Sequence, residues 1–152
     1  MREEARAFYD AFYQEVEAFV NEQLDQHTHL LVIDLYSYNH RRNGPDSKPA
    51  DKTSNPEINL GTTHLTKPEK WAAVIDTFES VLQSSGLDAR HDINFKGGHF
   101  SQWLNRKWPG RMCAVAVEVK KNFMDEWTGQ RDKDTFASIG TALEQATRDA
   151  KQ

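Results

Sequence analysis

Apolar side chains recur every three or four residues in three long segments of the chain, 3–26, 66–86 and 134–151. This spacing puts them on one face of a helix, so each segment is predicted to be an amphipathic helix with one buried side. A fourth, shorter helix is expected within 95–108, after two adjacent glycines. The residues predicted to face inward are Ala5, Phe8, Tyr9, Phe12, Val16, Phe19, Val20 and Leu24 in the first helix, Trp71, Val74, Ile75, Phe78, Val81 and Leu82 in the second, Phe100, Trp103 and Leu104 in the short one, and Phe136, Ile139 and Leu143 in the last.

Local signals predict where the second of these helices begins and ends. Thr66 and Glu69 have the spacing of a capping box, and Pro68 suits the first turn because no N–H is needed there. Gly86 is expected to stop the helix.

Two shorter segments, Leu30–Leu35 and Met112–Val119, are almost continuously apolar. Runs of this length, rich in β-branched residues, are typical of strands covered on both faces. A further segment, 87–93, is predicted to be an edge strand. Strands that alternate with helices indicate an α/β fold with a mainly parallel or mixed sheet flanked by helices. The length fits a single domain over residues 1–152.

No periodicity is visible from Tyr36 to Lys67, a segment with three prolines, two glycines and many polar residues. Loops of this length in a compact domain are usually functional or disordered. We favour a functional loop, because it begins with a polar and basic cluster, "DLYSYNHRR", directly after a predicted strand.

Composition excludes several classes of function. The formal net charge of −4 argues against non-specific nucleic-acid binding, and the basic groups, Arg41–Arg42 and Lys120–Lys121, are too short for a membrane-binding patch. No signal peptide or membrane-spanning segment is recognisable. The single cysteine, Cys113, is predicted to be buried and inert, and a chain without disulfides indicates a cytoplasmic protein.

Reactive side chains follow both central strands. The first strand leads into Asp34–Arg42, and the second ends in Glu118, with Lys120, Lys121, Asp125 and Glu126 after it. Ligands of open α/β sheets collect at the carboxyl ends of strands, so we expect the two groups to meet. Glu118 would there be a general base with a raised pKa; the alternative is a structural ion pair with a nearby Lys or Arg.

Arg41 and Arg42 could clamp a small dianion such as a dicarboxylate, because a guanidinium binds carboxylates through two parallel hydrogen bonds. The alternative is that at least one of them is a surface residue or pairs with Asp46 or Glu57.

His27 and His29 form a weak candidate metal pair, and "FKGGHF" is either an anion site at a helix start or a simple backbone turn. Zinc-protease, phosphate-loop and nucleophile-elbow motifs are absent from the sequence.

Two long blocks, "DLYSYNHRRNGPDSKPADKTSNPEINLGT" and "INFKGGHFSQWLNRKWPGRMCAVAVEVKKNFMDEWTG", resemble the C-terminal part of N-formylglutamate amidohydrolases. The resemblance extends over about residues 30–129. It implies a truncated zinc-carboxypeptidase-like (phosphorylase/hydrolase-like) fold. It also implies a zinc-dependent hydrolysis of an N-acyl amino acid, such as N-formyl-L-glutamate.

The resemblance also implies roles for particular residues. In the family a strand ends in Asp-x-His-Ser-Tyr, whose His binds zinc, and here that position is Tyr36. The general base corresponds to Glu118. The segment that contains Asn39, His40, Arg41 and Arg42 would hold the anionic groups of the substrate, with Asn39, Arg41 and Arg42 as the contacts.

The zinc site departs from the family pattern. A phenol is a poor zinc ligand at neutral pH because its ordinary pKa is about 10. The other two family ligands, a His and an acidic residue, have no counterpart before Leu30. We therefore expect a truncated chain, inactive alone, with zinc absent or weakly bound.

Three hypotheses remain. The chain is an amidohydrolase that a separate N-terminal chain or a second copy completes, or a metal-free binding module that keeps the anion-binding loop, or a degenerate fragment. The expected ligand is a small anionic acyl amino acid; no nucleic acid or membrane partner is expected.

Overall fold

The computed structural model describes residues 2–151 of the chain. The contacts within it divide the chain into two compact units, one up to Leu30 and one from Leu31 onward. The first unit consists mainly of helix α1, Arg2–Gln26, which confirms that this segment is helical. The predicted buried face is wrong for Phe8, Tyr9, Phe12 and Phe19, which are 49–79% exposed. No helix among the described residues is both long and apolar enough to cross a membrane.

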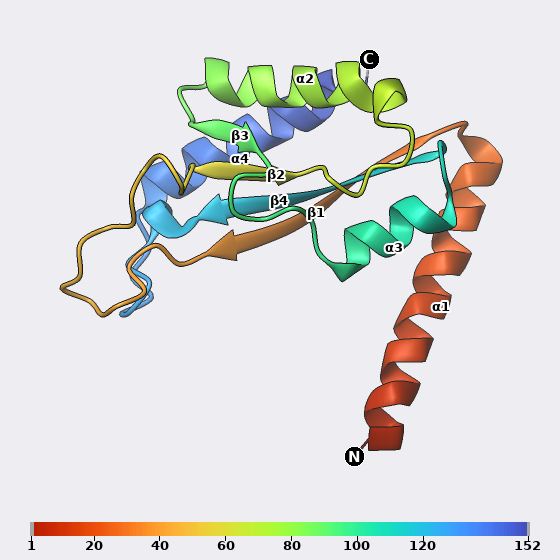
Figure 1. The fold of residues 1–152 in the computed structure, drawn as a ribbon, viewed down its shortest axis with the longest axis horizontal. Coiled ribbons are helices and arrows are strands. Elements are labelled where there is room, and N and C mark those ends of the chain that lie inside the picture. The colour runs from red at the N-terminus through yellow and green to blue at the C-terminus, as the bar shows by residue number, and fades with distance from the viewer. Residues whose placement is uncertain (1, 152) are drawn as a thin grey trace. The chain divides into compact units, whose positions relative to one another are not determined.

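The second unit is built on one sheet of four strands, as far as the described residues go, in the order β1-β4-β2-β3 (Figure 1). The strands are β1, Leu30–Tyr38, β2, Ile58–Gly61, β3, Ala89–His91, and β4, Met112–Lys120. β2 is parallel to β3 and antiparallel to β4, while β1 and β4 run in the same direction in Figure 1. The sheet is therefore mixed, which confirms the predicted α/β class.

The hydrophobic core lies between one face of this sheet and two helices, α2, Pro68–Ser84, and α4, Lys133–Asp149. Every second residue of β4 belongs to it, from Cys113 to Val119. Ile58 and Leu60 of β2 and Leu82 of α2 are completely buried there. Burying one such aliphatic side chain stabilises a fold by about 1.5–3 kcal/mol, so this layer holds the unit together.

Cys113 lies inside this core and is 1% exposed. Burial raises the pKa of its thiol to about 12, so the thiol stays protonated and unreactive in the folded chain. The prediction of a buried, inert cysteine is confirmed.

The predicted loop over 36–67 is wrong at two places. β1 continues to Tyr38, since the aromatic residues at 36 and 38 suit a strand, and Ile58–Gly61 forms β2. A strand of four residues that includes the polar Asn59 is too short to show an alternation of apolar and polar side chains. The prediction that Leu30–Leu35 is covered on both faces is also wrong, because β1 is an edge strand and Leu35 is 58% exposed.

The helix ends agree with the predictions except at the capping box. Pro68 opens α2, and Gly86, with a φ of 85°, follows its end. No side chain caps the helix, because the Thr66 hydroxyl instead donates a hydrogen bond to the Asn105 carbonyl oxygen at 3.1 Å. β3 confirms the predicted edge strand.

The inner faces of the last two helices differ from the predicted ones. Helix α3, His99–Lys107, buries Ser101, Leu104 and Asn105, whereas Phe100 and Trp103 stack on each other and stay partly exposed. In α4, Ile139 is buried but Phe136 is 47% exposed. Asn105 is buried although its side chain is polar, because it bonds the backbone of β4.

Asn105 joins α3 to the sheet through both atoms of its amide. Its Nδ2 donates to the Ala114 carbonyl oxygen at 2.8 Å, and its Oδ1 accepts from the Ala114 N–H at 2.9 Å. Asn105→Ala leaves both buried groups without a partner, so we expect the free energy of unfolding to fall by about 2–4 kcal/mol.

Denaturant unfolding measures this change. The control is Gln145→Ala, which removes an exposed bond to Asp149 and should change stability by less than about 0.5 kcal/mol. Equal effects of the two variants would show that the Asn105 amide does not anchor α3.

Candidate functional site

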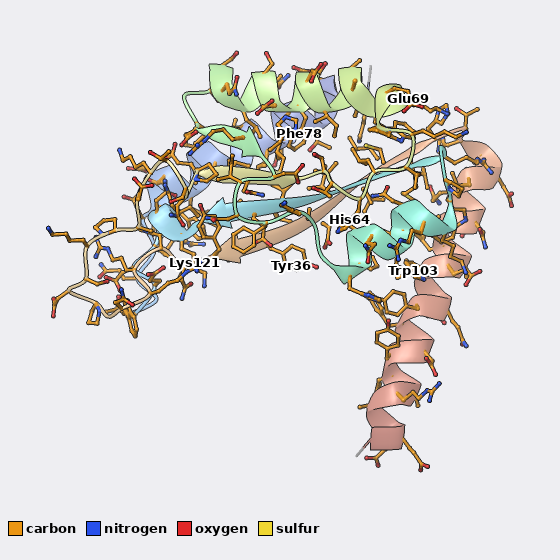
Figure 2. All side chains as sticks on the ribbon, viewed as in Figure 1. Tyr36, His64, Glu69, Phe78, Trp103 and Lys121 are labelled. Atoms are coloured by element: carbon orange, nitrogen blue, oxygen red, sulfur yellow. The ribbon has the colours of Figure 1, made fainter. Side chains whose placement is uncertain are left out.

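Three polar side chains come together on the sheet face opposite the core. Asp34 and Tyr36 are two residues apart in β1 and share a face, and Glu118 lies in the adjacent strand β4, directly across from Asn59 of β2. Figure 2 shows Tyr36 near the end of β1, on the same side of the sheet as α3. Side chains from the two strands, Asp34 and Tyr36 of β1 and Glu118 of β4, therefore lie together as expected.

The electrostatics of the three residues are coupled. Burial raises the pKa of Glu118, and the negative charge of Asp34 raises it further. Burial also raises the pKa of Asp34, while the Tyr36 hydroxyl and the backbone of Ser101 act in the opposite direction. The pKa of Tyr36 is raised by burial and by both carboxylates. The site thus holds two acids that cannot easily ionise together.

Neither a Lys nor an Arg is among the causes of the shift at Glu118, whose charged neighbour is Asp34. The shift therefore gives no support to the alternative of a structural ion pair. Asp34 Oδ2 is buried and has no hydrogen-bond partner among the described residues.

The segment between β3 and α3 closes the site along β2. The Asn59 amide donates to the Phe95 carbonyl oxygen at 2.7 Å and accepts from the Asn94 N–H at 2.9 Å. A Cβ on Gly61 would lie 2.4 Å from the Gly97 backbone nitrogen, so only glycine permits this approach. In "FKGGHF", Gly97 lies against Gly61 with a φ of 104°, whereas a Cβ on Gly98 would meet nothing within 4 Å, so the segment is a backbone turn in which Gly97 alone is constrained.

The long loop between β1 and β2 is anchored at its far end by two cations. Arg90 donates to the carbonyl oxygens of Lys52 and Thr53, both at 2.7 Å, and to the Asp88 carboxylate. Lys120 is 8% exposed, and its ammonium donates to the Asn55 carbonyl oxygen at 2.9 Å. Lys120 therefore fixes the loop.

The near end of the same loop is tied to the loop that follows β4. The Glu126 carboxylate accepts the backbone N–H groups of His40, at 2.9 Å, and of Arg41. The Trp127 indole N–H donates to the Arg41 carbonyl oxygen at 3.1 Å. These bonds hold two loops 86 residues apart in the sequence side by side.

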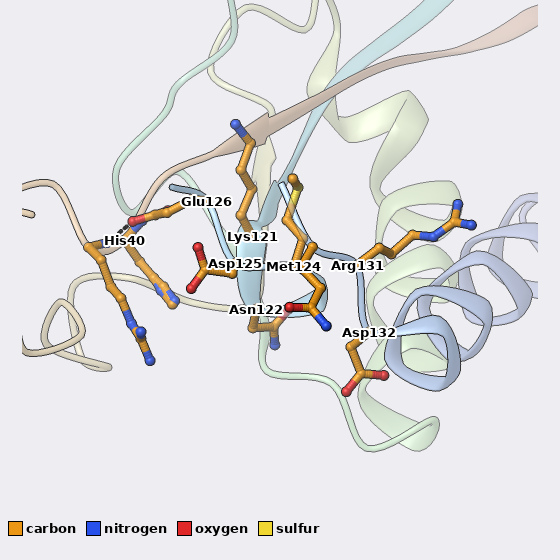
Figure 3. Close-up of a pocket in the computed structure, with 10 residues that line it drawn as sticks. His40, Lys121, Asn122, Met124, Asp125, Glu126, Arg131 and Asp132 are labelled. Atoms are coloured by element: carbon orange, nitrogen blue, oxygen red, sulfur yellow. Dashed lines mark hydrogen bonds between the residues drawn. The ribbon is translucent and has the colours of Figure 1, made fainter. Parts of the chain in front are cut away.

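A polar pocket of about 500 Å³ lies between these two loops (Figure 3). Its lining includes His40 and Arg41 from the first loop and Lys121, Asn122 and Asp125 from the second. Asn39 and Arg42 are not in its lining, and the Arg42 Nε donates to the Asn39 carbonyl oxygen at 3.0 Å. The structure therefore places Arg41 in the pocket and turns Arg42 toward its own loop.

The resemblance implied a zinc-ligand position at Tyr36, and the structure shows which side chains lie beside it. The Tyr36 phenol lies beside the carboxylates of Asp34 and Glu118, and no His or Cys is among the groups that shift their pKa values. Within residues 2–151 no group of three or more His, Cys, Asp or Glu side chains could hold a metal ion. Protein zinc sites use nitrogen and sulfur ligands with at most some carboxylate, so these residues do not fit a resident zinc ion.

Two solved structures share this mixed α/β fold. A solved N-formylglutamate amidohydrolase from Ralstonia eutropha JMP134 has this fold, with a TM-score of 0.70 and 16% identity, over 94% of this chain and 50% of that one. A gene product of Agrobacterium tumefaciens is similar with a TM-score of 0.51 and 15% identity, over 90% of this chain and 51% of that one. The chain thus spans about half the length of these structures.

The family model of N-formylglutamate amidohydrolase matches residues 1–124. The chain therefore belongs to the N-formylglutamate amidohydrolase family. None of the curated proteins matches it.

The raised pKa values make stability depend on pH. The folded chain retains the protons of Asp34 and Glu118 at pH values where the unfolded chain, with ordinary values of 3.8 and 4.5, has released them. Their stabilising effect is complete below these values and is lost as pH rises through the raised ones. We expect Glu118→Gln to increase the free energy of unfolding at pH 7 by on the order of 0.5–1 kcal/mol.

Urea unfolding from pH 4 to 8 tests this expectation. The curve of Glu118→Gln should be flatter above pH 4.5 than that of the unchanged chain. Glu144→Gln, at an exposed carboxylate of α4, serves as the control. A loss of stability in Glu118→Gln would instead support a structural ion pair.

Proposed function

We propose that this protein binds a small N-acyl amino acid, such as N-formyl-L-glutamate, and presents its amide bond to Glu118 for hydrolysis. The observation that carries the proposal is the Asp34–Tyr36–Glu118 cluster at the ends of β1 and β4, in a chain of this family. Glu118 would be the general base.

The chemistry of the acidic pair supports this role. A carboxylate with a raised pKa accepts a proton from water more readily near neutral pH than an ordinary one. Asp34 next to it would keep the pair singly ionised, so that one member can return the proton to the leaving amine. The Tyr36 hydroxyl would hold Asp34 in place.

The anionic end of the substrate would bind the loop after β1. Arg41 is the first candidate because it lines the polar pocket and its Nε is buried without a partner. Asn39 and Arg42 would support it, since the bond of Arg42 to Asn39 fixes the shape of the loop. A charge-assisted hydrogen bond of this kind is worth about 1.5–3 kcal/mol.

We also propose that hydrolysis in this family is metal-dependent, and that the fold is related to zinc carboxypeptidases. The described residues do not fit zinc, so the chain alone is expected to have little or no turnover. A complementing N-terminal chain or a second copy would have to supply the missing ligands.

The second candidate function is a metal-free binding module. It is favoured by one observation, the phenol of Tyr36 at the position of the family's zinc-binding His. In this case the chain would bind the acyl amino acid and release it unchanged.

Three measurements on the purified chain, without chelator or histidine tag, test the proposal: zinc by elemental analysis, formate release from N-formyl-L-glutamate, and calorimetric binding. We expect substoichiometric zinc and metal-free binding that Arg41→Gln weakens about tenfold. Glu118→Gln should keep the affinity within about threefold and abolish any turnover restored by a complementing chain.

The outcomes separate the candidates. Binding with turnover in the presence of a complementing chain supports the hydrolase, and binding without turnover under every condition supports the binding module. Stoichiometric zinc and turnover in the chain alone would contradict the expected lack of a zinc site. No binding at millimolar substrate would contradict both.

A further inference from the structure

The two edges of the sheet differ in how well they are protected. β3, at one end, has three residues, and the Arg90 side chain on it is bonded to the loop before β2. β1, at the other end, has nine residues, and β4 is its one neighbouring strand in the described part of the chain (Figure 1). The sequence of β1 contains a single charged residue, Asp34, and no Lys or Pro. Natural proteins protect long edge strands with such residues, so the edge of β1 is open to pairing with another strand.

Apolar side chains are exposed along this same edge, on the face of the sheet that carries α4. Leu31, Ile33 and Leu35 share this face because side chains alternate along a strand. Leu31 and Ile33 pack against the core, whereas Leu35 is 58% exposed. In the first turns of α4, Phe136 contacts the Phe123 ring but is still 47% exposed. The layer of helices therefore covers the beginning of β1 and leaves its end uncovered.

Two cavities, of about 400 and 380 Å³, lie between β1 and α4. Leu35 and Leu143 line both of them, so the two form one continuous groove. We define this β1–α4 groove by six residues, namely Ile33, Leu35 and Ser37 of β1 and Phe136, Gly140 and Leu143 of α4. A contiguous apolar surface of this kind is typical of a site of protein–protein contact.

The charges at the groove suit contact with an identical surface. The charged residues in its lining are Glu144 and Arg148, which have opposite signs and lie 3.5 Å apart. In a two-fold dimer the same patch lies on both sides of the interface, so a patch with an excess of one sign would repel its own copy. The β1–α4 groove has no such excess. Glu144 of one copy could face Arg148 of the other.

The geometry of the sheet suits the same symmetry. A two-fold rotation about an axis perpendicular to the sheet, placed beside β1, makes the two β1 strands antiparallel neighbours. Antiparallel strands form a regular ladder of hydrogen bonds. The rotation also keeps both α4 helices on one face of the joined sheet. The grooves of the two copies would then adjoin, and Leu35 and Phe136 of each copy would lose their exposure together.

We propose that a second copy of this chain docks on the β1–α4 groove, with the two β1 strands paired antiparallel in one continuous sheet. Tyr36, which lines one end of the groove, then lies beside the interface. The inference rests on the proposed function only in specifying where the second copy considered there would dock. It requires neither zinc nor turnover.

Sedimentation of the full chain from about 1 to 200 μM tests the proposal, since the dimer fraction depends on concentration. We expect a monomer–dimer equilibrium. Leu35→Lys places like charges from both copies in an apolar interface, so it should weaken the dimer at least about hundredfold. The control is Ile93→Lys, at an apolar residue 41% exposed beyond β3, and it should change the dimer affinity less than about threefold. A monomer over the whole range, or a dimer that Leu35→Lys leaves intact, would overturn the proposal.

Hydrogen exchange tests the strand pairing separately from the side chains. In the unchanged chain the amides of β1 should exchange at least about tenfold more slowly in the dimer than in the monomer, while those of β3 should not change. Leu35→Lys should remove this dependence and should melt at the same temperature as the unchanged monomer, because Leu35 is exposed there. Exchange of β1 that is independent of concentration in a dimeric chain would overturn the proposed pairing.

This proposal and the proposed function fail separately. A monomer that binds N-formyl-L-glutamate overturns the docking of a second copy and leaves the substrate site standing. A dimer that Leu35→Lys dissociates, but that binds no N-formyl-L-glutamate, supports the docking surface and contradicts the proposed substrate.

Discussion

The alternation of side chains along β4 governs the whole second unit. One set of residues, from Cys113 to Val119 at every second position, packs against α2 and α4, and the other set, which includes Ala114 and Glu118, faces α3 and the site. A strand with period two can serve both purposes only if its register is fixed. The bonds of Asn105 to Ala114 and the pairing of Asn59 with Glu118 fix it.

The loops depend on this frame for their order. A stretch rich in proline and polar residues gains no stability from a core of its own, and here it is held by charged groups at its two ends. Arg90 and Lys120 bind its carbonyl oxygens at one end, and Glu126 binds its N–H groups at the other. Each of these bonds pairs a full charge with a backbone dipole, the stronger class of hydrogen bond.

Periodicity explains which parts of the fold were predictable. α1, α2, α4 and β4 are long and regular, and a carboxylate at the end of a buried strand, as at Glu118, is unusual enough to stand out in the sequence alone. β2 was not predicted, because a strand of four residues that includes the polar Asn59 is too short to show alternation of apolar and polar side chains. The capping box at Thr66 failed because that hydroxyl bonds a residue 39 positions away, which no local pattern records.

The site was predictable to a similar degree. The rule that ligands gather at strand ends correctly joined Asp34 to Glu118. It could not find the roles of Asn122 or Glu126, because each depends on a partner brought close by the fold, Glu57 in one case and His40 in the other. The separation of Arg41 from Arg42 follows from loop geometry, which adjacent letters in a sequence do not reveal.

The single thiol of Cys113 gives the chain an internal reporter of its own opening. A reagent that modifies thiolates can reach this atom only when the layer between β4 and the two core helices comes apart. The rate of labelling under native conditions would therefore report the free energy of that opening, without the need to introduce any probe. Comparison of this value with the free energy of global unfolding would show whether the layer around Cys113 opens only when the whole unit unfolds.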